Sequence, residues 1–186
     1  PAQLSVRVVH LGIGAFHRAH QAVYFDDLQR KTGNSLGILG VSLRGTDVRD
    51  QLEPQDGLYS VMTLNDAEKS LRVIAAVRAV VHAPSNPARV LEAMAATTTK
   101  IWSLTVTEKA YCHLPATGAL NFEHPDIEYD LQHPNTPRSA IGYLVSALAS
   151  RYQQRKAPII LCCDNLPNNG ALLRGLVLSF ARARNK

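Results

Sequence analysis

The chain has 186 residues, of which 46% are hydrophobic and 19% charged, and its net charge is +5 at neutral pH. This composition is typical of one globular domain and excludes a disordered chain. No apolar run approaches the roughly 20 residues of a membrane-spanning helix, and residues 1–7 lack the apolar core of a signal peptide. The basic residues are dispersed, so we expect small anionic ligands rather than nucleic acid or a membrane.

In the first half of the chain, apolar runs alternate with polar segments. The expected elements are a strand at 6–11, a helix at 18–31 closed by Gly33, a strand at 36–43, a turn or short helix at 44–52, and strand-like runs at 58–64 and 71–77. The polar residues between the last two runs predict a β-hairpin.

The second half continues the alternation. We expect a helix starting at Asn86 with that residue as its N-cap, a strand at 100–107, a loop at 110–137, a helix at 139–155, a strand at 157–163 and a helix at 168–184. Strands that alternate with helices predict an α/β fold. The expected architecture is a doubly wound, Rossmann-type, mainly parallel sheet with helices on both faces and an inserted β-hairpin.

The three cysteines do not suggest a disulfide framework. Their count is odd, and Cys162 and Cys163 are adjacent in an apolar strand. We expect one of these two side chains to face the core and neither to be reactive, since no cationic partner is apparent. A reducing cytoplasm is the simplest location.

The first strand ends in a glycine turn, "GIG". Gly12 would permit a tight turn, and Gly14 would let the backbone approach a pyrophosphate bound at the following helix N-terminus. His17 stands where a dinucleotide fingerprint has its third glycine, which should loosen the helix–strand contact. The alternative is a plain strand-to-helix turn. His17 and His20 share a helix face, but no neighbouring carboxylate or cysteine completes a metal site, so we expect no metal.

Three other strand ends carry polar residues that could contact a ligand. After the second strand, Asp47 could accept the ribose hydroxyls of NAD or cap a short helix, whereas Arg44 leaves NADP open. At the end of the strand at 100–107, Thr105 and Thr107 could contact a nicotinamide ribose or amide. Glu108 lies at the same strand end.

Lys109 follows directly and could act as a base or pair with its acidic neighbour, and we favour the ion pair. After the last strand, Asn165 could donate a hydrogen bond to a developing alkoxide or simply form a turn. We expect Asn168 to be the N-cap of the final helix.

Together, four stretches resemble the polyol-specific long-chain dehydrogenases, a family that includes mannitol 2-dehydrogenase and fructuronate reductase. The stretches are "VVHLGIGAFHRAHQAVYFDDL", "SLTVTEKAYC", "SAIGYLVSAL" and "CDNLPNNGALLRG". The resemblance implies an NAD(P)-dependent, metal-independent oxidoreductase that interconverts a secondary alcohol of a sugar alcohol or aldonate with the matching ketone. A cofactor loop would then contain Gly12, Gly14, Ala15, Phe16 and His17.

The same resemblance assigns further roles. Asp47 would be the acidic ribose-binding residue, and Thr46 stands where members often carry a second acid, which leaves the choice between NAD and NADP open. Asn165 would help to hold the alkoxide. The general acid/base would be a lysine of a second, mainly helical C-terminal domain.

We therefore expect residues 1–186 to form an NAD(P)-binding Rossmann domain that lacks this substrate domain. Such a chain should bind cofactor, turn over polyol or aldonate poorly, and expose apolar surface that favours self-association. The leading hypothesis is the cofactor-binding part of an enzyme that interconverts mannitol and fructose. The alternatives are fructuronate reductase (D-mannonate oxidoreductase) and a non-catalytic nucleotide-binding module.

Overall fold

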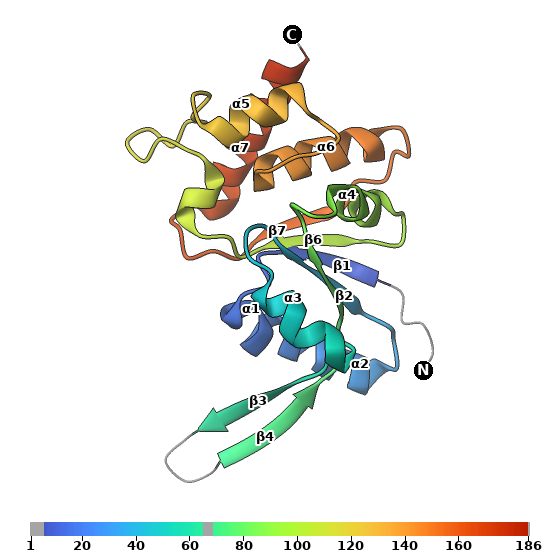
Figure 1. Cartoon of the computed structure of the whole chain (residues 1–186). Coiled ribbons are helices and arrows are strands. Elements are labelled where there is room, and N and C mark those ends of the chain that lie inside the picture. Colours follow the sequence, from blue (N-terminus) through green and yellow to red (C-terminus); the bar gives the residue numbers. More distant parts are fainter. Residues whose placement is uncertain (1–5, 65–68, 186) are drawn as a thin grey trace.

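A parallel sheet forms the centre of the molecule (Figure 1). The computed structural model describes residues 6–64 and 69–185. The sheet order is β5-β2-β1-β6-β7, and its neighbouring strands are all parallel. The strands are β1 (Val6–Leu11), β2 (Gly37–Ser42), β5 (Val77–His82), β6 (Ile101–Leu104) and β7 (Ile159–Cys162). This order confirms the predicted doubly wound, Rossmann-type architecture.

Helices cover both faces of this sheet (Figure 1). One face carries α1 (Ala15–Ala19), α2 (Gln21–Thr32) and α3 (Asp47–Leu52). The other carries α4 (Pro87–Ala95), α5 (Pro125–Gln132), α6 (Ala140–Tyr152) and α7 (Asn169–Arg184). Two short 3-10 turns, η1 (Glu53–Gln55) and η2 (Glu108–Tyr111), complete the described helical elements. In the described part of the chain, no helix combines the length and apolarity that crossing a bilayer requires.

The central strand β1 shows why the sheet forms here. Val8, Val9 and Leu11 are completely buried. Val8 belongs to the hydrophobic core on one face, whereas Val9 and Leu11 belong to the core on the other. A strand that is covered on both faces needs a nearly continuous apolar run, and "VRVVHL" supplies one.

Two helix ends, at Gly33 and Asn86, confirm the sequence signals, and a third, at Ser139, has a cap that was not predicted. Gly33 adopts the left-handed conformation (φ 69°) that closes α2. The side chain of Asn86 accepts a hydrogen bond from the Arg89 amide at the start of α4. Ser139 accepts one from the Gly142 amide at the start of α6.

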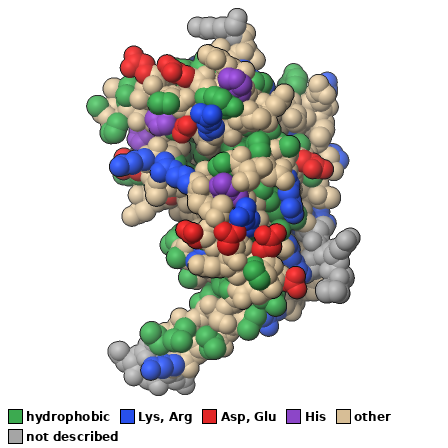
Figure 2. Space-filling model, in the orientation of Figure 1, with side chains coloured by type: hydrophobic (Ala, Val, Ile, Leu, Met, Phe, Trp, Pro, Cys, Tyr) green, Lys and Arg blue, Asp and Glu red, His purple; other side chains and the backbone are tan. Residues whose placement is uncertain are grey.

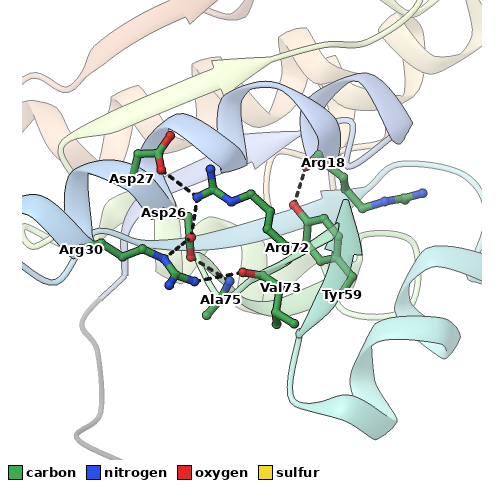
Figure 3. Close-up of polar contacts among 8 residues, drawn as sticks. All are labelled: Arg18, Asp26, Asp27, Arg30, Tyr59, Arg72, Val73 and Ala75. Atoms are coloured by element: carbon green, nitrogen blue, oxygen red, sulfur yellow. Dashed lines mark hydrogen bonds and ion pairs between the residues drawn. The ribbon is translucent and has the colours of Figure 1, made fainter. Parts of the chain in front are cut away.

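The predicted hairpin is confirmed as β3 (Tyr59–Leu64) and β4 (Lys69–Ile74), which pair antiparallel with Met62 opposite Leu71. It projects from the body of the molecule (Figure 1). The base of the hairpin is held by buried Asp26 of α2. The Asp26 carboxylate accepts hydrogen bonds from the Ala75 amide and from two arginines, Arg30 and Arg72 (Figure 3). The hairpin is therefore anchored to α2 by charge-assisted hydrogen bonds.

Three expectations were wrong in detail. The run after residue 71 is two strands, because β4 ends at Ile74 and β5 starts at Val77. The helix expected at 18–31 starts at Ala15 and breaks at His20, whose φ and ψ of −126° and −81° leave the helical region. The loop expected at 110–137 contains α5, which starts at Pro125 because proline favours the first helical position.

Candidate functional site

A groove of about 280 Å³ lies at the carboxyl ends of β1, β2 and β6. In a doubly wound fold this edge is where ligands bind. The groove contains five of the residues selected from the sequence, namely Gly12, Gly14, Arg44, Thr105 and Thr107. Ile13, Ser42, Leu43, Val48, Val106 and Ala110 complete its lining.

The two glycines of the turn have different roles. Gly12 has φ +96°, and a Cβ there would collide with the carbonyl oxygen of Thr105. Gly12 is therefore required by the fold itself. At Gly14 the nearest atom to an added Cβ would be the Gly12 oxygen at 3.9 Å, so the space beside it is open.

The start of α1 offers free amide groups beside this open space. Gly14 occupies the N-cap position, and its own amide bonds to the Gly12 oxygen at 2.6 Å. The amides of Ala15 and Phe16 belong to the first helical turn, where no intrahelical acceptor exists. Within residues 6–64 and 69–185, neither of these two amides donates a hydrogen bond to a backbone carbonyl. The Phe16 side chain is exposed beside these amides.

Behind the turn lies a pair of buried histidines. The rings of His10 and His17 stack with their centroids 3.5 Å apart. His10 Nδ1 lies 2.8 Å from the Ser103 hydroxyl, and its Nε2 lies 2.8 Å from the Thr105 hydroxyl and 3.1 Å from the Gly12 oxygen. This network joins the glycine turn to the end of β6. It also closes the helix–strand contact that we expected His17 to loosen.

Both histidines are held in the neutral form. Burial lowers the pKa of His17 to about 4, and burial together with the neighbouring His17 lowers the pKa of His10 well below its usual value. His17 Nδ1 lies 2.8 Å from Gln21 Oε1, an acceptor, which places the proton on Nδ1. Among the described residues its Nε2 is buried and has no hydrogen-bond partner.

At the end of β2, Arg44 and Asp47 differ in their position relative to the groove. Arg44 lines the groove, whereas Asp47 is exposed, is the first residue of α3 and is outside the groove lining. Asp47 does not cap α3, because the N-cap position belongs to Thr46 and no side chain there makes a capping hydrogen bond within the described residues.

At the end of β6, the expected pairing of Glu108 with Lys109 is wrong. Glu108 starts η2, and its carboxylate lies 3.9 Å from His113 Nε2. Lys109 makes no ion pair within the described part of the chain. Adjacent side chains on this short helix point in different directions, which separates the two charges.

At the end of β7, a hydrogen-bond network fixes the turn that carries Asn165. The Asp164 carboxylate accepts from the Val106 amide at 3.0 Å and the Tyr111 hydroxyl at 2.5 Å. The side-chain amide of Asn169 donates to the carbonyl oxygens of Asp164 and Cys162, at 2.7 and 3.2 Å. Asn165 is exposed at this edge and is outside the groove lining.

Asn168 and the cysteines complete this end. Asn168 occupies the N-cap position of α7 as predicted, but in a left-handed conformation (φ 50°) without a side-chain capping bond in the described structure. Cys162 Sγ contacts the Tyr111 hydroxyl, and Cys163 Sγ accepts from Gln21. Burial raises the pKa of the Cys163 thiol, so this residue does not resemble a reactive cysteine.

Sequence reasoning missed His10, Tyr111 and the carboxylate of Asp164. Their partners lie far away along the chain, and the only available signal was a histidine inside an apolar strand. As for metals, the structure of residues 6–64 and 69–185 contains no group of three or more His, Cys, Asp or Glu able to hold an ion.

A family model described as the mannitol dehydrogenase Rossmann domain matches residues 6–186. The chain belongs to the mannitol dehydrogenase family. It is 43% identical over 184 residues to mannitol 2-dehydrogenase of Aspergillus oryzae, covering 96% of this chain and 37% of that protein. It is 40% identical over 189 residues to D-mannonate oxidoreductase of Escherichia coli, covering 99% of this chain and 39% of that protein.

Solved structures agree with this family assignment. A ternary complex of Pseudomonas fluorescens mannitol 2-dehydrogenase with NAD and D-mannitol matches with a TM-score of 0.90 and 35% identity, over 99% of this chain and 38% of that one. A substrate-free D-sorbitol dehydrogenase matches with a TM-score of 0.91 and 32% identity, over 98% of this chain and 39% of that one. The chain thus spans less than two-fifths of the length of these relatives.

Proposed function

We propose that this chain is the cofactor-binding part of an NAD(P)-dependent oxidoreductase that interconverts a sugar alcohol such as mannitol with its ketose, fructose. The open space beside Gly14 is the observation that carries this proposal. It adjoins the amides of Ala15 and Phe16, which could donate hydrogen bonds to the diphosphate of a cofactor. The relative solved with NAD and D-mannitol supports the same assignment.

The remaining residues would orient the two ends of the dinucleotide. Thr105 and Thr107 would contact the nicotinamide ribose or amide, and Glu108 stands at the same mouth. Arg44 would lie on the adenosine side, with Asp47 nearby at the start of α3. His17 would act from behind, because its stack on His10 holds the turn in place. When bound, the cofactor exchanges a hydride with the carbinol carbon of the substrate.

Asn165 is the catalytic residue that we assign to this chain. Its side-chain amide would donate a hydrogen bond to the substrate oxygen as negative charge develops there. The Asp164 and Asn169 hydrogen bonds fix the backbone on which it stands. A base must also take the hydroxyl proton. We assign that base, and most substrate contacts, to a further helical domain that continues beyond this chain in the whole protein.

A second candidate is reduction of fructuronate to D-mannonate. The Escherichia coli D-mannonate oxidoreductase is 40% identical, close to the 43% of the Aspergillus oryzae mannitol 2-dehydrogenase. The intact protein should be assayed on mannitol and on mannonate with both cofactors. A kcat/KM at least tenfold higher for mannitol supports the first function, and the reverse ratio supports the second.

Cofactor binding can be tested on this chain alone by titration with NADH and NADPH. Saturable enhancement of the nicotinamide fluorescence is expected, with little or no oxidation of mannitol. No saturable binding of either nucleotide would contradict the proposal. Ordinary polyol dehydrogenase turnover by these 186 residues would contradict the assignment of the base to another domain.

We also infer a cytoplasmic location and a tendency to self-associate. The three cysteines are free, as a reducing compartment would keep them. Apolar side chains gather on the projecting hairpin (Figure 2), where Met62, Leu64, Leu71 and Val73 are each at least half exposed. Exposed apolar clusters of this kind promote association. Sedimentation of the purified chain over a range of concentrations would measure it.

A further inference from the structure

The ends of two neighbouring strands carry residues that the proposed reaction needs. Thr107 follows β6, and Asn165 follows β7. Within the described residues, the last backbone hydrogen bond between these strands runs from the Cys163 amide to the Leu104 carbonyl oxygen, at 2.9 Å. Any further connection between the two strand ends must therefore come from side chains.

The Asp164 carboxylate extends the connection by one step. Leu104 pairs with Cys162 in the parallel register, so Val106 stands opposite Asp164. The Val106 amide donates a hydrogen bond to Asp164 Oδ2 at 3.0 Å. Hydrogen bonds to an ionised acceptor are stronger than those to a neutral carbonyl. A side chain thus continues the ladder of hydrogen bonds beyond the ends of the strands.

Tyr111 of η2 reaches the same carboxylate oxygen. Its hydroxyl donates to Asp164 Oδ2 at 2.5 Å and lies 2.8 Å from Cys162 Sγ. The Tyr111 ring is completely buried in the hydrophobic core, which fixes the position of the hydroxyl. Burial raises the pKa of this phenol, and the hydrogen bond to Asp164 raises it further, so the phenol keeps the proton that it donates. One oxygen atom therefore joins η2, the end of β6 and the end of β7.

The position of Asn165 is set by this arrangement, because its neighbours shape the turn. The Asp164 carbonyl oxygen accepts from the Leu166 amide at 2.9 Å and from the Asn169 side chain at 2.7 Å. Asn165 itself is exposed. Its place relative to the end of β6 thus depends on Asp164, whose carbonyl oxygen and carboxylate are both held.

We propose that Tyr111 and Asp164 are a pair of positioning residues, which hold Asn165 at the distance from the nicotinamide that hydride transfer requires. The inference rests on the proposed function, because it assumes that Asn165 donates a hydrogen bond to the substrate oxygen. In the oxidation, the carbinol carbon gives its hydride to the oxidised nicotinamide and the hydroxyl proton passes to the base. Negative charge develops on the substrate oxygen during this step, and a donor held in place stabilises it.

The pair should affect the chemical step more than the binding of either ligand. Neither Tyr111 nor Asp164 has to touch cofactor or substrate in this role. Misplacing a group in the active site by about 1 Å can slow a reaction about a hundredfold. Loss of the pair should therefore lower the rate of hydride transfer and leave the affinity for the cofactor nearly unchanged.

The test is a single-turnover measurement on the intact protein with saturating mannitol or mannonate, whichever it oxidises. With protein in excess over the cofactor, the rate constant of nicotinamide reduction reports hydride transfer and is independent of the folded fraction. Tyr111→Phe keeps the buried ring and removes only the hydroxyl. Its rate constant should fall about tenfold, whereas the NADH Kd should stay within about twofold of the wild type.

A second buried tyrosine provides the matched control. The Tyr143 hydroxyl of α6 donates to the Ala83 carbonyl oxygen at 3.3 Å, and its ring is also completely buried. Tyr143→Phe therefore removes a comparable hydrogen bond away from Asn165 and should keep the wild-type rate constant. A loss of rate in Tyr143→Phe equal to that in Tyr111→Phe would reduce the effect to general destabilisation and overturn the inference.

Two variants of Asp164 separate positioning from acid–base chemistry. Asp164→Asn keeps an oxygen that can accept from Val106 and Tyr111, so its rate constant should stay within about threefold of the wild type. Asp164→Ala removes the acceptor and should slow hydride transfer about a hundredfold. Equal losses in the two variants would indicate that the carboxylate acts as a base, which would overturn the inference.

The inference and the proposed function can fail separately. An unchanged rate constant in Tyr111→Phe, even where less of the protein binds NADH, would overturn the positioning role and leave the proposed function intact. A wild-type protein that oxidises neither mannitol nor mannonate would overturn both.

Discussion

His17 of α1 lies face to face with His10 of β1, with the ring centroids 3.5 Å apart and the ring planes 15° from parallel. Both rings are buried, and the His10 imidazole also contacts the Gly12 carbonyl oxygen. The stack thus connects the interior of the sheet to the turn on which the proposed cofactor site depends. Its protonation state should affect the stability of the fold.

The histidine pair predicts a loss of stability in mild acid. Burial lowers the pKa of His17 from 6.5 to about 4. Between these values the unfolded chain binds a proton that the folded chain does not, so the free energy of unfolding falls as the pH is lowered. The slope from this site approaches about 1.4 kcal/mol per pH unit at its steepest. Urea unfolding at several pH values between about 7.5 and about 4 would measure this slope.

A variant isolates the contribution of this side chain. His17→Phe keeps an aromatic ring in the stack but cannot be protonated, so its stability should depend less on pH across this window. His20→Phe, at an exposed position next to the same helix, is the matched control and should behave like the wild type. An unchanged slope in His17→Phe would mean that the stacked pair is not the origin of the acid sensitivity.

The two glycines of the turn should separate stability from binding. A Cβ at Gly12 would collide with Thr105, and its φ of +96° is strained for any other residue. Gly12→Ala should therefore lower the free energy of unfolding by about 1–3 kcal/mol or more. At Gly14 an added Cβ has room and the backbone is extended. Gly14→Ala should therefore change the free energy of unfolding by less than about 0.5 kcal/mol.

For Gly14→Ala, NADH affinity should nevertheless fall at least tenfold, because the methyl group would occupy the space proposed for the diphosphate. Calorimetry and nucleotide titration on the same samples would separate the two effects. Wild-type affinity in a fully folded Gly14→Ala chain would exclude this turn as the diphosphate site.

The anchor of the hairpin depends on Asp26. Its side chain is 3% exposed and accepts hydrogen bonds from Arg30, Arg72 and the Ala75 amide (Figure 3). Asp26→Ala leaves these donors unsatisfied and should cost about 2 kcal/mol or more in urea unfolding. Asp27→Ala removes the neighbouring carboxylate, which also pairs with Arg72 but is exposed. If both variants unfolded at the same urea concentration, the buried carboxylate would not be the anchor.

Gly142 in α6 packs against buried Asp130, whose carboxylate accepts from the Ser139 amide and hydroxyl. A Cβ at Gly142 would collide with that carboxylate. Gly142→Ala should lower the melting temperature although alanine favours helices. Gly175→Ala in α7 meets no atom within 4 Å and should raise stability by up to about 1 kcal/mol. Opposite signs for the two variants are the expected result, and stabilisation by both would contradict it.

Local signals in the sequence predicted the framework of the fold. The apolar run of β1, the glycine turn and the caps at Gly33 and Asn86 each depend on neighbouring residues, and each lies where it was predicted. The boundary between β4 and β5 was missed because Ala75 and Ala76 carry no turn signal.

The site was harder to predict because it is assembled from distant segments. His10 bonds to Ser103 and Thr105, which are 93 and 95 positions away. No local pattern in the sequence marks such partners. A cavity of about 510 Å³ whose lining includes Arg44, Lys109 and Arg138 likewise combines residues from the ends of β2 and β6 with residues of α5 and the α5–α6 connection.

The most direct test of the account is an amide NMR spectrum of the isotopically labelled chain, recorded with and without saturating NADPH or NADH. A diphosphate bound at the start of α1 should shift the amides of Gly14, Ala15 and Phe16 most strongly, with smaller shifts at Thr105 and Thr107. Largest shifts away from this edge of the sheet, or none at saturation, would contradict a dinucleotide site at the glycine turn.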